Sequence, residues 1–156
     1  MGEARSLTRL TVFIENGEFI LMDVEGDAGL PPGAPDPRTL SVMSTTWLTA
    51  GANAAVISSD FDVHTADVVV EVWSGEPPVD PTPQSDVSEA IFTSSSGTIT
   101  FDEVTGTDED YPEIHLGLPG DYHIRVIRRR LRSEDPTTLV AEFEGLEFFC
   151  IQLWRL

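Results

Sequence analysis

The sequence predicts an all-β fold, an antiparallel β-sandwich or jelly-roll-like domain, from three observations. Apolar runs of strand length recur at intervals of about 8–12 residues. Clusters of Gly, Pro, Asp and Ser separate these runs. No segment shows the periodicity of an amphipathic helix. With 156 residues, the chain has the length of one domain, spanning 1–156, and is long enough to bury a core.

The first two expected strands, residues 10–14 and 19–24, flank Asn16 and Gly17. Both residues tolerate positive φ, so this pair is the strongest short signal for a β-hairpin. A stretch rich in Pro and Gly follows at about 26–37, and it cannot sustain a helix or a paired strand. Because a lone hairpin is unstable, we expect this stretch to be a loop within one domain.

The remaining strands are expected at residues 40–48, 53–59, 67–73, 87–92, 97–101, 113–118, 122–127 and 147–154. Alternation along 67–73 predicts a strand with one face fully buried. A second Pro-rich loop is expected at about 75–83, and the sequence Leu118-Pro119-Gly120-Asp121 predicts a tight turn. Residues 139–143 are expected either to extend the last strand or to form a short helical turn.

Charge is the feature that most restricts function. The chain has 27 acids, nine arginines and no lysine, which gives a net charge of -18. Neither lysine nor arginine occurs between Thr39 and His123, where fifteen acids accumulate. Such a field repels nucleic acid and anionic membranes, and it attracts basic proteins. We therefore expect a basic protein partner, such as a nuclease or toxin, and neither a nucleic-acid nor a membrane partner. The equal alternative is an acidic housekeeping protein of unassigned role, whose acidity serves solubility.

The candidate partner-binding surface is an acidic strand-loop-strand unit. Tyr111 lies among its acids, and an aromatic residue ringed by polar groups is typical of an interface hot spot. The alternative is that Tyr111 merely packs beside Pro112 on a solvated loop. The expected contact residues are Asp102, Glu103, Asp108, Glu109, Asp110, Tyr111 and Glu113. A calcium-binding β-sandwich module that uses residues 108–110 is a second function, because hard cations prefer carboxylate oxygens.

Motifs for catalysis or for a structural metal are missing from the sequence. There is no GxSxG, no Gly-rich phosphate loop and no HxH or HExxH arrangement. His115 and His123 flank a tight turn and are the nearest approach to a metal pair. We expect no enzyme, cofactor or metal site, with a small hydrolase as a third alternative. Cys150, the single cysteine, lies among apolar neighbours and is expected to be a buried thiol in a cytoplasmic protein.

Five arginines lie within eight residues: Arg125, Arg128, Arg129, Arg130 and Arg132. In a strand, the side chains of residues 128 and 130 point to one face and that of 129 to the other. We expect neutralisation by Glu134, Asp135 and the acidic loops, or a role in discouraging edge-to-edge strand pairing. Phosphate binding is the alternative.

The order of motifs in the second half of the chain resembles a known family. Gly120-Asp121-Tyr122 enters an alternating strand after the apolar run that ends at Leu118-Pro119, and Gly97-Thr98-Ile99-Thr100-Phe101 precedes it. This order, closed by 147–154, resembles the competence protein J family of small bacterial β-sandwich proteins associated with inhibition of a DNA-entry nuclease. The resemblance covers about residues 65–154. It implies an inhibitor or immunity-type protein, whose acidic surface would occupy a basic cleft as a phosphate mimic.

Overall fold

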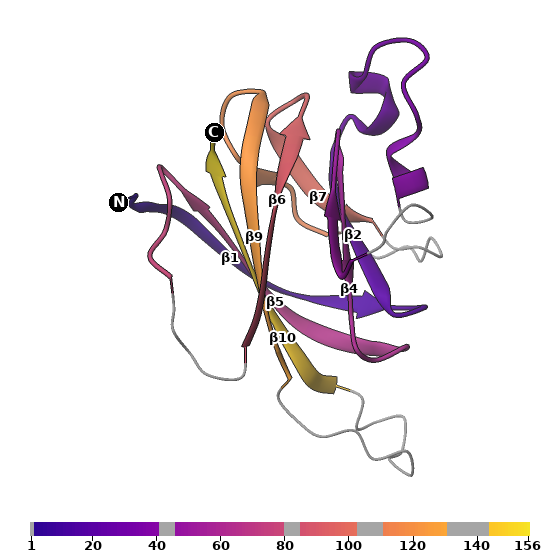
Figure 1. Cartoon of the computed structure of the whole chain (residues 1–156), viewed down its shortest axis with the longest axis vertical. Coiled ribbons are helices and arrows are strands. Elements are labelled where there is room, and N and C mark those ends of the chain that lie inside the picture. Colours follow the sequence, from indigo (N-terminus) through magenta and orange to yellow (C-terminus); the bar gives the residue numbers. More distant parts are fainter. Residues whose placement is uncertain (1, 41–45, 80–84, 103–110, 131–143) are drawn as a thin grey trace.

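The chain forms two β-sheets that pack face to face (Figure 1). The computed structural model describes residues 2–40, 46–79, 85–102, 111–130 and 144–156. Sheet A has the strand order β1-β5-β10-β9-β6 and sheet B the order β3-β4-β2-β7-β8. The predicted all-β sandwich of two sheets is confirmed.

The strands of sheet A are β1 (Ala4–Ile14), β5 (His64–Trp73), β6 (Ser85–Ser94), β9 (Gly120–Arg130) and β10 (Glu144–Arg155). The strands of sheet B are β2 (Glu18–Asp23), β3 (Leu48–Ala50), β4 (Ala54–Ser58), β7 (Thr98–Asp102) and β8 (Ile114–His115). Two short 3-10 helices, η1 (Gly26–Gly29) and η2 (Pro37–Thr39), lie at the two ends of the first Pro-rich loop. The expectation that this stretch sustains no helix is therefore wrong for single 3-10 turns, which are too short to be excluded by the nearby prolines. No helix among the described residues is long and apolar enough to cross a membrane.

Asn16 and Gly17 form the predicted turn, with φ values of 56° and 72°. The strands on either side do not continue as a hairpin. Beyond a single bridge between Glu15 and Glu18, β1 pairs with β5 in sheet A, whereas β2 pairs with β4 and β7 in sheet B. The hairpin prediction is therefore right for the turn and wrong for the strand pairing. The reason is that both strands bury apolar residues, which face each other across the sandwich instead of lying side by side.

Sheet A is mixed, because β10 runs parallel to β5 and antiparallel to β9. All other pairs between the described strands are antiparallel. A parallel pair requires a long connection between its strands. Here that connection includes four other strands and places β10 in the centre of sheet A.

Some strand boundaries differ from those predicted. β1 begins at Ala4 instead of residue 10, and β8 is confined to Ile114–His115. The strand expected at 40–48 is shifted, because Leu40 has helical dihedral angles at the end of η2 and β3 begins only at Leu48. Residues 41–45, and the segment 139–143 with its two alternatives, lie outside the described residues.

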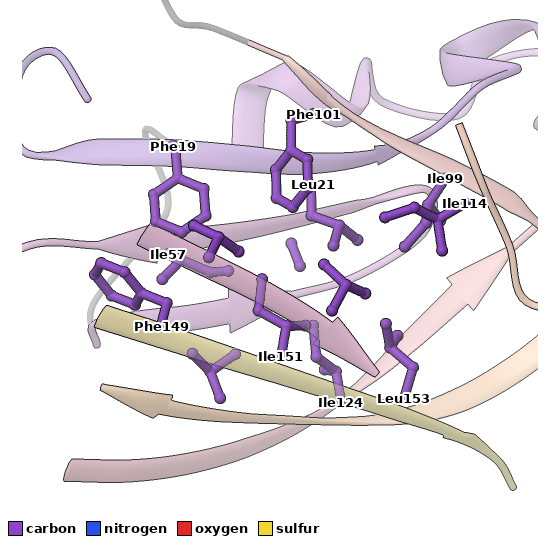
Figure 2. Close-up of a cluster of buried hydrophobic side chains, with 14 of the residues drawn as sticks. Phe19, Leu21, Ile57, Ile99, Phe101, Ile114, Ile124, Phe149, Ile151 and Leu153 are labelled. Carbon is purple, nitrogen blue, oxygen red and sulfur yellow. The ribbon is translucent and has the colours of Figure 1, made fainter. Parts of the chain in front are cut away.

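The core fills the space between the sheets. Figure 2 shows Phe19 and Leu21 of sheet B facing Phe149 and Ile151 of sheet A. The rings of Phe19 and Phe149 meet edge to face with centroids 5.1 Å apart, an arrangement that aromatic pairs favour. Cys150 points the other way from its two core neighbours and its thiol is buried, as predicted.

Candidate partner-binding surface

The structure describes three of the seven predicted contact residues. Asp102 ends β7, and Tyr111 and Glu113 lead into β8. The remaining four residues, Glu103, Asp108, Glu109 and Asp110, lie outside the described residues. Because β7 and β8 are adjacent antiparallel strands, the two ends of the acidic unit run alongside each other. The hydroxyl of Thr100 donates to the carbonyl oxygen of Pro112 at 3.3 Å, which holds them together.

Tyr111 is half-buried and packs against the core. Its ring meets that of Phe101 edge to face with centroids 6.0 Å apart. Its hydroxyl oxygen accepts a hydrogen bond from the backbone N–H of Phe13 at 3.2 Å. Tyr111 thus links β7 of sheet B to β1 of sheet A, which neither the anchor nor the solvated-loop alternative anticipated. Its role as an anchor for a partner stays a prediction.

Asp102 forms an ion pair on the surface. Its carboxylate lies 2.8 Å from Nε of Arg38, which follows Pro37 in η2. The Arg38 side chain is 58% exposed, and pairs of this kind contribute little to stability. The pair between Arg38 and Asp102 is therefore a weak surface contact. Glu113, directly before β8, is exposed.

The arginines of β9 alternate between faces as predicted. Arg128 lies 2.9 Å from Asp86 and 3.6 Å from Asp60, and Arg130 lies 3.1 Å from Asp60. Arg129 points to the other face and stacks over Phe148. Acidic residues do neutralise the first two arginines. The predicted acids Glu134 and Asp135, together with Arg132, lie outside the described residues.

Arg125 is the most buried of the arginines that pair with described acids. The residue is only 3% exposed, and its guanidinium pairs with Glu76 at 3.0 Å and Glu89 at 2.5 Å. It also donates to the carbonyl oxygen of Pro77 and stacks over Trp154. These contacts fasten the second Pro-rich loop across the outer face of sheet A. Four of the five N–H groups of this buried guanidinium thus donate to protein oxygens, the fourth acceptor being the side chain of Gln152. This disfavours the phosphate-binding alternative for this residue.

A buried cluster of Ser59, His64 and Glu147 was missed by sequence reasoning. Nε2 of His64 lies 2.8 Å from Oγ of Ser59 and 3.4 Å from Oε1 of Glu147, and the Ser59 hydroxyl donates to the same Oε1. The side chains of His64 and Glu147 are fully buried. In a catalytic triad the acid holds Nδ1 of the histidine, but Nδ1 of His64 has no hydrogen-bond partner within the described part of the chain. The cluster therefore lacks triad geometry.

A second buried cluster holds the turn between β6 and β7. The carboxylate of Asp23 accepts hydrogen bonds from the hydroxyl of Ser94 and from the N–H and hydroxyl of Ser96. Burial acts to raise the pKa of Asp23, but these bonds, with one from the N–H of Glu25, lower the pKa below its ordinary value of 3.8. Asn53, with φ of 62°, adds hydrogen bonds to Ser95 from the adjoining segment. The serine cluster predicted as a turn is thus a turn clamped by a buried carboxylate.

The structure separates the two histidines considered as a metal pair. His115 lies in β8 of sheet B, where its Nδ1 is 3.0 Å from the hydroxyl of Thr98. His123 lies in β9 of sheet A and stacks on Trp154. Across the described ranges there is no group of three metal-ligating side chains. The calcium alternative depends on residues 108–110, which are outside those ranges, and stays a prediction.

Two solved structures share this fold over almost their whole length. One is the crystal structure of ComJ from Bacillus subtilis, inhibitor of the DNA-degrading activity of NucA, with a TM-score of 0.60, 11% identity and coverage of 100% of this chain and 99% of that chain. The other is described as crocagin biosynthetic gene J, with a TM-score of 0.58, 12% identity and coverage of 96% and 97%. No family model and no curated protein sequence matches this chain.

These similarities confirm the resemblance to competence protein J at the level of fold. They also extend it through the first strands of the sandwich, which the sequence motifs did not cover. At such low identity, the likeness carries no residue-level correspondence.

Proposed function

We propose that this protein is an inhibitor-type binding protein whose partner is a nuclease or another basic protein. The observation that carries the proposal is the full-length fold likeness to ComJ, which is an inhibitor of a DNA-degrading activity. The net charge of -18 supports it. Nucleases hold the phosphate backbone with basic residues, so an acidic surface of matching shape competes for the same groups.

We propose further that the acidic unit around β7 and β8 makes the contact. Asp102 and Glu113 stand at its two ends, and the half-buried Tyr111 fixes one end to both sheets. An anchored base of this kind limits the conformational entropy that binding would cost. Three of the nine arginines, Arg125, Arg128 and Arg130, are paired with acids elsewhere on the molecule, and Arg38 is paired with Asp102 of the unit itself. Their positive charge is thereby compensated locally.

The direct test is retention and inhibition of a nuclease. The protein is immobilised, a cell extract of its source organism is passed over it, and bound proteins are eluted with a salt gradient. Each fraction is assayed for cleavage of fluorogenic double-stranded DNA, with and without added free protein. We expect a DNA-degrading activity that elutes as salt screens the charges, and that stoichiometric amounts of the protein suppress.

The matched control is an immobilised folded protein of similar net charge. Retention of the same nuclease by both would show ion exchange rather than recognition. If no retained nuclease is inhibited by the free protein, the proposal is wrong. The alternative, that the acidic surface serves solubility, would then be preferred.

A further inference from the structure

A small pocket lies at the end of sheet A where β1 begins and β10 ends. Ala4 is opposite Trp73, and Trp73 is opposite Trp154, so the register brings these two strand ends to the same place. The pocket has a volume of about 220 Å³. Among its lining residues are Arg5, Trp73, Ser74, Leu116, Tyr122 and Arg155. None of the functional residues discussed above belongs to it.

Neither of the two arginines in this pocket forms an ion pair with an acid in the part of the chain that the structure describes. Eight of the nine arginines lie in the described part of the chain. Arg38, Arg125, Arg128 and Arg130 each lie within ion-pair distance of an acid. Arg5 makes no ion pair with a described residue, and Arg155 makes only a 3.4 Å hydrogen bond to the carbonyl oxygen of Pro119. In a chain with 27 acids, two unpaired guanidiniums in one pocket leave strong donors for an anion.

Arg5, Tyr122 and Arg155 line the same pocket. Burial raises the pKa of the Tyr122 hydroxyl, and the positive charges of Arg155 and Arg5 act in the opposite direction. The same hydroxyl donates to the carbonyl oxygen of Leu118. This leaves the two arginines as the cationic donors that face the pocket.

Arg9 and Arg129 are also without an acidic partner among the described residues, and both line a second, more open hollow on sheet A. Arg9 lies on β1 and Arg129 on β9, with β5 and β10 between them. Three strand spacings separate their backbones by about 14 Å. Arg129 is also engaged by Ser85 and the Phe148 ring.

The rest of the pocket is apolar. Leu116 is buried and contributes one wall, Trp73 is half-buried, and Leu118 is 69% exposed at the rim. A glycine helps to keep the cationic side open, because a Cβ at Gly120 would lie 3.3 Å from a guanidinium nitrogen of Arg155. An anion held by the two arginines would thus place its apolar portion against Trp73 and the leucines.

We propose that this pocket binds a small monocarboxylate with an aromatic or branched apolar body. A carboxylate matches the planar fork of a guanidinium. The pocket, at about 220 Å³, is smaller than the usual range of ligand sites, about 300–1,000 Å³, so the ligand is small. The net charge of -18 opposes an approaching dianion twice as strongly as a monoanion, which favours a carboxylate over a phosphate monoester.

The test is a titration followed by tryptophan fluorescence, with Trp73 as the reporter. The probes are 3-phenylpropanoate, its uncharged amide and phenyl phosphate, with isovalerate and acetate as smaller carboxylates. We expect saturable binding of 3-phenylpropanoate, with the amide at least about tenfold weaker, because hydrogen bonds to charged groups contribute that much. Acetate, without an apolar body, is expected to bind weakest of the carboxylates.

Arg5→Gln and Arg155→Gln should each weaken 3-phenylpropanoate binding by about tenfold or more. Both side chains are exposed, so the variants should retain the fold, which thermal unfolding verifies. Arg9→Gln is the matched control, an exposed and unpaired arginine on the same strand as Arg5 but outside the pocket, and it should leave binding unchanged. Trp73→Phe removes the fluorescence reporter, so its binding of 3-phenylpropanoate is measured by isothermal titration calorimetry. We expect this variant to bind although it gives no fluorescence signal.

Three results would each overturn the inference. They are no saturable binding of any carboxylate, equal binding of the acid and its amide, and arginine variants that bind as the unmodified protein does. Tighter binding of phenyl phosphate than of 3-phenylpropanoate would overturn the assignment of a monocarboxylate. None of these results bears on nuclease inhibition, which uses another surface.

Discussion

The imidazole of His64 and the carboxylate of Glu147 meet inside the sandwich, with Nε2 3.4 Å from Oε1 and neither side chain exposed. Ser59 joins them, because its hydroxyl donates to Oε1 and its oxygen lies 2.8 Å from Nε2. The single hydroxyl hydrogen is used toward Glu147, so Nε2 of His64 carries the hydrogen of the second bond. The cluster fastens the start of β5 to β10 and to the segment after β4.

Replacement of Glu147 with alanine should destabilise the protein by about 3–5 kcal/mol, since it leaves buried polar groups unpaired. The groups affected are the Ser59 hydroxyl, the His64 imidazole and the backbone N–H of Asp60. Urea unfolding at neutral pH measures the loss. Glu113→Ala removes an exposed carboxylate and should change stability by no more than about 0.5 kcal/mol. A loss below about 1 kcal/mol for Glu147→Ala would show that the cluster is not stabilising.

Asp23 should make stability depend on pH in the acid range. Its pKa is lowered in the folded state from an ordinary value of 3.8. The stabilisation that Asp23 contributes is therefore complete above the unfolded-state pKa and is lost as the pH falls through the lower folded-state pKa. Asp23→Asn should cost about 1–3 kcal/mol at pH 7, and its difference from the unmodified protein should shrink below about pH 4.

Urea unfolding of both proteins across the acid range checks this prediction. Asp27→Asn, at an exposed position in η1, is the control and should leave the pH dependence unchanged. A difference between Asp23→Asn and the unmodified protein that grows as the pH falls would contradict the assigned direction of the shift.

Gly97 and Gly33 offer a comparison between strain and steric clash. Their φ values, 80° and 85°, are nearly equal. A Cβ at Gly97 would lie 2.1 Å from the carbonyl oxygen of Gly117, whereas a Cβ at Gly33 would have nothing within 4 Å. Gly33→Ala should cost about 1 kcal/mol, the price of positive φ alone. Gly97→Ala should cost about 3 kcal/mol or more, because the segment between β7 and β9 must move.

Thermal unfolding followed by circular dichroism distinguishes the two. In a domain of this size, about 1 kcal/mol lowers Tm by roughly 2–4 °C, so the two variants should differ clearly. Equal losses of stability for both substitutions would mean that the backbone near Gly117 moves away from the added Cβ without a measurable free-energy cost.

The strands were largely predictable from the sequence, whereas their partners were not. The turn at Asn16-Gly17 follows from two residues that accept positive φ, which is local information. The assignment of the flanking strands to opposite sheets depends on β4, β5 and β7, which come later in the chain. The parallel neighbour of β5 is likewise the last strand, and no local pattern specifies it.

The buried polar clusters were beyond sequence reasoning for a related reason. Ser59 and Glu147 are 88 residues apart and each has an ordinary local context. A glutamate at the start of a long apolar run was the one available signal, because a charge there must be paired when buried. The faces to which the β9 arginines point were easier to predict, since alternation along a strand determines which of them share a face. Their partners Asp60 and Asp86 could not be distinguished from the other acids in the sequence.

Neutralisation of the acidic unit should slow association with a partner nuclease. In the triple variant Asp108→Asn, Glu109→Gln and Asp110→Asn, three charges are removed from the proposed contact. Steering by exposed charges is screened over about 8 Å at physiological ionic strength, so the decrease in on-rate should be largest at low salt. Stopped-flow or surface-based kinetics at several salt concentrations measure it. An unchanged on-rate at low salt would exclude this unit from the interface.

The central position of β10 determines when the protein is able to fold during synthesis. Until residues 144–155 have left the ribosome, sheet A consists of two separate ribbons, β1 with β5 and β9 with β6. Two-stranded ribbons are marginal in water, and each would present an unpaired edge, on β5 and on β9, next to apolar side chains. Assembly of the sandwich is consequently a late event, which follows the emergence of its last strand. During that interval the charged side chains of the two strands, acids on β5 and mainly arginines on β9, oppose association of these edges with other chains.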